Sequence, residues 1–128
     1  MYYRGNEPRS FGSKTRLSVG VRANRECPLG VVHRYLDPNN EQRIALGIRQ
    51  KQEIQLEGFY NDWSRERIEQ ELRVSHSRRE QYWLRHIVQL DCWPTLFVCG
   101  ACHIEPFCLL AKTAGLFVDL VEADWAPA

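Results

Sequence analysis

The chain has 128 residues, of which 44% are hydrophobic and 26% are charged. This composition is typical of one globular domain and excludes a collagen-like chain, a largely disordered chain and a membrane bundle. The formal net charge is only +1. Nothing in the overall charge therefore calls for nucleic acid or an acidic membrane as a partner.

Basic residues are concentrated near the N-terminus. Residues 1–36 carry seven Arg or Lys and two Glu, whereas residues 37–128 carry ten Arg or Lys and fourteen Asp or Glu. The basic residues of the first segment are spread singly, without a run of five or more. We interpret this segment as solvated and not as an arm that binds nucleic acid.

The sequence predicts a cytoplasmic protein that does not contact a membrane. The first residues lack the apolar region of a secretory signal. The longest apolar stretches, near residues 96–98 and 107–111, are too short to span a bilayer. The five cysteines are then expected to be thiols, because cytosolic reductants keep them reduced.

The pattern of turn-forming residues predicts one domain with a short leader. Residues 1–15 are rich in Gly, Pro and Ser and show no periodicity, so we expect a flexible lead-in there. Residues 16–128 are expected to form a single α/β domain. Within it, the β-branched and aromatic residues of 31–36 predict a short strand.

Two helices are predicted in the middle of the chain. The first would be capped by Asp37, would hold Pro38 at its first position, and would end at Gly47. Apolar residues spaced by four predict a longer helix over 64–90. A capping-box pattern inside that helix predicts a break near residues 75–77.

The last third of the chain has the order strand, helix, strand. Residues 95–99 form an apolar run without alternation, which is typical of a strand buried on both faces of a parallel sheet. A helix is predicted over 103–114 and a second strand over 116–121. We therefore expect a β-α-β unit with a right-handed crossover, and an α/β fold with a mostly parallel sheet.

The segment Cys99-Gly100-Ala101-Cys102-His103 is the candidate site, and several interpretations compete for it. Cys-x-x-Cys-His is the signature of c-type haem attachment, which needs export and usually a second axial ligand. A strand followed by Cys-Gly-x-Cys and a helix is the local order of a thioredoxin-like redox pair. Here, however, the apolar run leads into Cys99 without an intervening loop.

Two further interpretations concern a metal and the protein core. A metal site would use Cys99, Cys102 and His103, with Cys108 as a candidate fourth ligand, because thiolates and imidazoles are zinc ligands. The second pair of ligands that structural zinc sites usually have is not evident in the sequence. Alternatively, Cys99 and Cys108 are small core residues, as buried cysteines commonly are.

His103 is the residue of this segment for which the sequence gives a site position. Gly100 would allow a tight turn or the close approach of another group. His103 would then lie in the first turn of a helix, at the carboxyl end of a parallel strand. Open α/β sheets bind ligands at this edge.

Several short motifs resemble a known superfamily. They are Arg79-Glu80-x-x-Trp83-Leu84-x-x-Ile87, Leu96-Phe97-Val98-Cys99-Gly100-Ala101-Cys102-His103, and Leu109-Leu110 followed by Gly115. Together they resemble the C-terminal half of the TraB/Tiki, ChaN and erythromycin-esterase-like proteins. His33-Arg34-Tyr35-x-Asp37-Pro38 and Arg43-x-x-Leu46-Gly47-Ile48 are similar to an uncharacterised bacterial family of the same general kind. The similarity covers residues 30–125.

The resemblance implies a small Rossmann-like, mostly parallel sheet flanked by helices. It makes His103 the site histidine, Gly100 the turn glycine, and Arg79 with Glu80 the facing polar pair. Relatives have an N-terminal half that supplies an acidic residue and a histidine, and this chain does not show one. A truncated or divergent member is therefore an alternative to an active one.

The predicted topology would bring the polar residues to one edge of the sheet. If strand 31–36 is parallel to strand 95–99, Asp37 and His103 share that edge. With Arg43, Arg79 and Glu80 they could hold an anion, or a divalent metal with a water. His103, Glu80 and Asp37 are the catalytic candidates, Gly100, Arg79 and Arg43 the ligand-binding ones, and His103 the metal ligand. His76 and His86 are expected on an exposed helical face.

The resulting functional hypothesis is a hydrolase-like domain that binds a small molecule or peptide, with a divalent metal as the candidate cofactor. The alternative is a non-catalytic binding domain or the remnant of a larger enzyme. A thiol-redox protein that uses Cys99 and Cys102 is the third hypothesis. Nucleic acid is not expected as a partner, and a homo-oligomer or a missing N-terminal half remains open.

Overall fold

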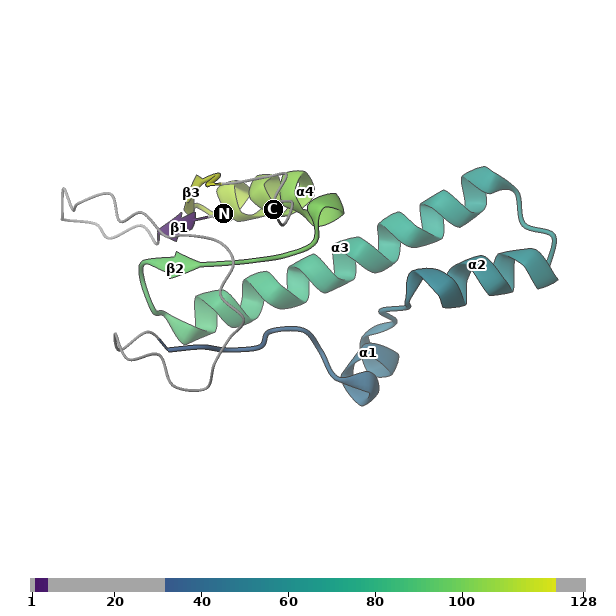
Figure 1. The fold of residues 1–128 in the computed structure, drawn as a ribbon, viewed down its shortest axis with the longest axis horizontal. Coiled ribbons are helices and arrows are strands. Elements are labelled where there is room, and N and C mark those ends of the chain that lie inside the picture. Colours follow the sequence, from purple (N-terminus) through teal and green to yellow (C-terminus); the bar gives the residue numbers. More distant parts are fainter. Residues whose placement is uncertain (1, 5–31, 122–128) are drawn as a thin grey trace, which may run out of the picture. The chain divides into compact units, whose positions relative to one another are not determined.

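The computed structural model describes residues 2–4 and 32–121. Most of the described residues are helical (Figure 1). The elements are β1 (Tyr2–Arg4), α1 (Asn40–Leu46), α2 (Lys51–Tyr60), α3 (Arg65–Leu90), β2 (Thr95–Leu96), α4 (Ala101–Thr113) and β3 (Phe117–Asp119). The chain divides into two compact units, residues 37–86 and residues 1–36 with 87–128, which are described separately.

Helix α1 begins two residues later than the sequence predicted. Its cap is Asn39, whose Oδ1 accepts from the backbone N–H of Gln42 at 2.9 Å. The Gln42 side chain accepts from the backbone N–H of Asn39 at 2.9 Å and completes a capping box. Asp37 is therefore not the cap. The predicted end is confirmed, because Gly47 closes the helix in the left-handed conformation with φ 66°.

The turn between α1 and α2 is hydrogen-bonded to α3. The hydroxyl of Ser75 accepts from the backbone N–H of Arg49 at 2.8 Å and donates to its carbonyl at 2.6 Å. Arg78 Nη1 donates to the carbonyl of Gly47 at 3.0 Å. Two successive turns of α3 thus satisfy the backbone groups of one irregular segment, which fixes the entry to α2.

Helix α3 runs without interruption over 26 residues, so the predicted break near residues 75–77 is wrong (Figure 1). Ser75 is buried and uses its hydroxyl on Arg49, and the hydroxyl of Ser77 accepts from the side chain of Gln81. In these hydrogen bonds neither serine accepts from a backbone N–H of α3, so neither caps a helix start. The expected start is confirmed, since Ser64 Oγ accepts from the backbone N–H of Arg67 at 3.2 Å.

The second unit contains a small antiparallel sheet of order β2-β1-β3. β1 lies between the other two strands and is antiparallel to both, with Tyr2 opposite Leu96 and Asp119. The predicted Rossmann-like, mostly parallel α/β sheet is therefore wrong. The strands are only two or three residues long, and β1 comes from the segment predicted as a lead-in. The rest of this predicted lead-in, residue 1 and residues 5–15, lies outside the described residues.

The two apolar segments predicted as long strands have other structures. Residues 32–36 are irregular, so the strand expected over 31–36 is not formed in its described part. Of the run 95–99, only Thr95 and Leu96 are in a strand. Phe97 is buried because its ring packs on Phe107, with centroids 4.7 Å apart. Phe97 is thus buried by packing onto a helix and not inside a sheet, and its neighbour Val98 is 60% exposed.

Helix α4 and strand β3 confirm the expected helix and second strand, with β3 shorter than predicted. His103, Phe107 and Ala111 are spaced by four and form the buried face of α4. Among the described residues, no helix is both long and apolar enough to cross a bilayer.

Candidate functional site

The first turn of α4 holds the residues that the sequence singled out. Gly100 is the N-cap, with φ −63° and ψ 149°, and offers no side chain to the first helical N–H groups. A Cβ atom built on Gly100 would meet its nearest neighbour, His103 Cδ2, at 3.9 Å, which is an ordinary contact. The close approach of another group that Gly100 would allow is therefore not seen among the described residues.

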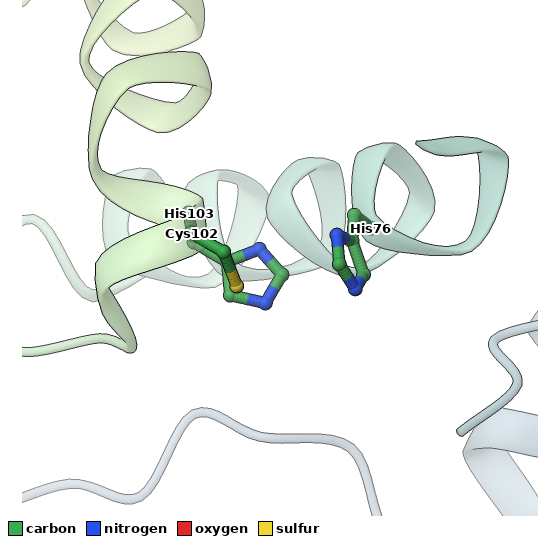
Figure 2. Close-up of side chains that lie close together, drawn as sticks. All are labelled: His76, Cys102 and His103. Atoms are coloured by element: carbon green, nitrogen blue, oxygen red, sulfur yellow. The ribbon is translucent and has the colours of Figure 1, made fainter. Parts of the chain in front are cut away.

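Cys102 and His103 offer two ligand atoms of the kind that bind transition metals. The Sγ atom of Cys102 and a ring nitrogen of His103 lie within 4.8 Å of one another (Figure 2). Cys102 is exposed, whereas His103 is 6% exposed. Figure 2 also labels His76, which comes from α3 and belongs to the unit of residues 37–86. The pair on α4 is thus one solvent-accessible thiol beside one buried imidazole.

The other cysteines of this region do not extend the pair in the described residues. No set of three ligand atoms within 4.8 Å of one another includes Cys99 or Cys108 in this part of the chain. None of the four described cysteines forms a disulfide. Burial raises the pKa of the Cys108 thiol, and the nearby Lys112 partly opposes this effect. The four-ligand arrangement considered from the sequence is therefore not assembled in this structure.

A second polar cluster lies in the unit of residues 37–86. Asp37 Oδ1 is 3.3 Å from Nε of Arg79 and accepts from Nε1 of Trp83 at 3.2 Å. Arg79 and Trp83 are four residues apart and therefore lie on one face of α3. Asp37 and Arg79, two of the five residues expected to share one ligand site, therefore contact each other. The contact is an intramolecular ion pair, and its carboxylate neutralises the cation that an anionic ligand would need.

The remaining predicted site residues are not part of this cluster in the interactions that the structure shows. Arg43 donates to the side chain of Asn40 within α1. Glu80 follows Arg79 in sequence, is 5% exposed, and lies about 100° further round α3. Each of these residues has a local setting of its own within the unit of residues 37–86.

The shared edge expected for Asp37 and His103 does not exist. It required a strand over 31–36 parallel to one over 95–99, whereas residues 32–36 are irregular and only Thr95–Leu96 are in a strand, which pairs with β1. The hydrolase-like activity expected of His103, Glu80 and Asp37 was argued from that edge, so it loses this argument and stays a prediction. His76 and His86 are half-buried and not exposed. His86 Nδ1 is 2.9 Å from the carbonyl of Tyr82, and the two rings lie 4.0 Å apart.

One contribution was missed from the sequence. No role was predicted for Trp83, but its indole N–H donates to Asp37. The spacing of four between Arg79 and Trp83 was the available signal. Cys102 was considered as a metal ligand, but the resemblance singled out only Gly100 and His103 of this segment.

No protein-family model matches the chain, and neither a curated protein nor a solved structure is significantly similar to it. The resemblance to the TraB/Tiki and ChaN proteins therefore has no support from these comparisons.

Proposed function

We propose that this chain binds a thiophilic divalent metal ion, zinc in the first place, with Cys102 and His103 supplying two of its ligands. The observation that carries the proposal is the distance of less than 4.8 Å between the thiol sulfur and an imidazole nitrogen in one helical turn. Thiolate and imidazole together select zinc and related ions over magnesium and calcium, which prefer oxygen.

The spacing of the pair fits a single tetrahedral ion. Zinc binds sulfur at about 2.3 Å and nitrogen at about 2.0 Å, which places two such ligands about 3.5 Å apart. The two atoms are within 4.8 Å, so their separation would have to shorten by at most about 1.3 Å for both to bind one ion. The N-terminus of a helix also favours the negative charge of a bound thiolate.

The two proposed ligands differ in their exposure to solvent, and this difference determines which of them an arriving ion meets first. Cys102 is exposed and meets an ion arriving from solvent, whereas His103 is buried and held by α4. The histidine backbone N–H donates to the carbonyl of Gly100 at 2.9 Å, which fixes its position in the turn. The proposed site thus combines one reachable ligand with one positioned ligand.

Titration with Co²⁺ tests the proposal, because a cobalt–thiolate bond gives a near-ultraviolet charge-transfer absorption. Wild-type protein is expected to show this absorption at one equivalent. Cys102→Ser is expected to lose it, and His103→Ala to weaken binding at least tenfold. The control is Cys92→Ser, which removes another exposed thiol. Absorption that survives in Cys102→Ser, or that is lacking in the wild type, contradicts the proposal.

Two of the four zinc positions remain for other ligands. Substituting each of the other histidines and cysteines singly, and repeating the Co²⁺ titration, identifies which of them contribute. Cytoplasmic localisation belongs to the same proposal, since a reducing compartment keeps the Cys102 thiol available as a ligand.

A non-catalytic binding domain is the second candidate, and the outer face of α2 supports it. Leu56, Phe59 and Tyr60 are spaced by three and one and share one side of that helix. They are 59%, 76% and 74% exposed. Replacing Phe59 by Ser is expected to reduce the binding of an apolar dye by the chain, and an unchanged dye signal contradicts this role for α2.

A further inference from the structure

The outer face of α4 forms an apolar groove of about 580 Å³. Its lining residues on the helix follow the spacing of one helical face, and Leu120 after β3 forms its side. The lining is Ala101, Ile104, Glu105, Cys108, Leu109, Lys112 and Leu120. Leu109 is 68% and Leu120 48% exposed, so large apolar side chains face solvent here.

Two opposite charges lie on this face of α4. Glu105 and Lys112 are both exposed and seven residues apart, which is two helical turns or about 10.5 Å along the axis. The point midway between them along the helix lies between Cys108 and Leu109. The groove therefore has an acidic and a basic residue on either side of an apolar centre, and Ala101 and Ile104 extend it beyond Glu105.

This charge order is complementary to its own antiparallel copy. When two α4 helices pack antiparallel about a two-fold axis between Cys108 and Leu109, each Glu105 meets the Lys112 of the other copy. A two-fold interface always repeats each contact, so both ion pairs form at once. A parallel arrangement would instead place glutamate against glutamate.

We propose that the groove on α4 is the interface of a homodimer in which two copies of α4 pack antiparallel. Cys108, Leu109 and Leu120 form its apolar centre, and Glu105 and Lys112, one on each side of it along the helix, form its charged rim. This arrangement is the usual one for a specific interface, in which charged residues are depleted from the centre. The proposal is independent of the metal site.

The apolar centre supplies most of the affinity and the rim sets the orientation. Exposed ion pairs contribute little to stability, whereas like charges in contact exclude a wrong partner or register. A single charge reversal on the rim therefore has a doubled effect, since it creates two like-charge contacts in the symmetric dimer.

Sedimentation equilibrium over a concentration series tests the dimer. Glu105→Lys and Lys112→Glu are each expected to weaken dimerisation at least tenfold, because each replaces two attractive contacts by two repulsive ones. The double variant exchanges the charges and keeps the complementarity, so it is expected to return to within about threefold of the wild type. The control is Glu66→Lys, an exposed reversal on α3.

A second pair of variants tests the apolar centre without changing charge. Leu109→Ser is expected to be monomeric, and Val98→Ser, which changes a side chain 60% exposed outside the groove, is expected to dimerise as the wild type does. Circular dichroism confirms that each variant is folded. A monomeric wild type overturns the proposal, as does a double reversal no better than the single ones. Stronger association of Glu105→Lys overturns the antiparallel arrangement.

Discussion

Asp37 Oδ1 lies 3.3 Å from Nε of Arg79 and 3.2 Å from Nε1 of Trp83, so one carboxylate oxygen engages two successive turns of α3. The Asp37 side chain is 54% exposed, whereas that of Arg79 is 20% exposed. The carboxylate therefore accepts one hydrogen bond, from the indole of Trp83, and forms an ion pair with the largely buried Arg79. It holds the irregular segment before α1 against the long helix.

Replacing Asp37 by Ala is expected to lower the free energy of unfolding by about 1 kcal/mol. The loss of one hydrogen bond accounts for most of it, because the partly exposed ion pair adds little. Urea unfolding followed by circular dichroism measures the change. Gln55→Ala, an exposed substitution on α2, is the control and is expected to stay within about 0.5 kcal/mol. Equal effects of the two variants contradict a structural role for Asp37.

Ser75→Ala is expected to destabilise the protein by about 2 kcal/mol. Ser75 is only 3% exposed. The substitution removes its hydroxyl and leaves the backbone N–H and carbonyl of Arg49 without that hydrogen-bond partner. Ser77→Ala, two residues further along the same helix, removes an exposed hydroxyl and is expected to cost less than about 0.5 kcal/mol. If both substitutions lower the free energy of unfolding equally, the hydrogen bonds between Ser75 and the α1–α2 turn do not stabilise the protein significantly.

Gly47→Ala is expected to cost about 1–2 kcal/mol, because φ is 66° there and an added Cβ would lie 2.5 Å from Arg78 Nη1. The same substitution in an Arg78→Ala background separates the two causes. The steric part disappears and the backbone part, about 1 kcal/mol, remains. Thermal unfolding of the four proteins measures both parts. A full loss of the effect in the double variant would show that backbone conformation is unimportant.

The alkylation of Cys108 is expected to need a higher pH in the folded protein than in the unfolded chain. Burial raises the pKa of this thiol, so its alkylation in the folded protein should rise at higher pH than in the urea-unfolded chain. Lys112→Gln removes the nearby cation that opposes the shift and should slow the reaction further. Peptide mass spectrometry after timed iodoacetamide treatment measures both rates. If alkylation of the folded protein rises at the same pH as that of the unfolded chain, or at a lower pH, the expected direction is contradicted.

The same raised pKa has a consequence for stability. Below the pKa of an unfolded thiol, Cys108 is protonated in both states and its contribution is fully present. As the pH rises toward the higher folded pKa, the unfolded chain releases its proton first, and stability is lost. The slope of unfolding free energy against pH should therefore be smaller in Cys108→Ala over this alkaline range.

Local signals in the sequence predicted local structure well. Gly47 ends its helix because a left-handed residue is needed there, and the spacing of apolar residues located α3 and α4. The predicted break in α3 failed because Ser75 is used by a distant backbone segment, Arg49. No pattern within α3 reveals that partner. A side chain that can cap a helix can equally serve a turn elsewhere in the chain.

The sheet could not be predicted for a related reason. Phe97 belongs to an apolar run whose pattern predicts a buried strand. The Phe97 side chain is instead buried against Phe107 on α4. The strand that lies between β2 and β3 is Tyr2–Arg4, about 90 residues away in sequence from its partner at Leu96. Pairing over such a separation depends on tertiary context. The error in the sheet then carried over to the site, because Asp37 and His103 were joined only through it.

The metal content of the purified protein tests the central claim most directly. Wild type, His103→Ala and Cys92→Ser would be purified without chelator and measured by inductively coupled plasma mass spectrometry. The proposal predicts zinc bound in stoichiometric amount to wild type and to Cys92→Ser, and its loss from His103→Ala. Equal metal in all three proteins, or none in the wild type after equilibration with zinc, would contradict it.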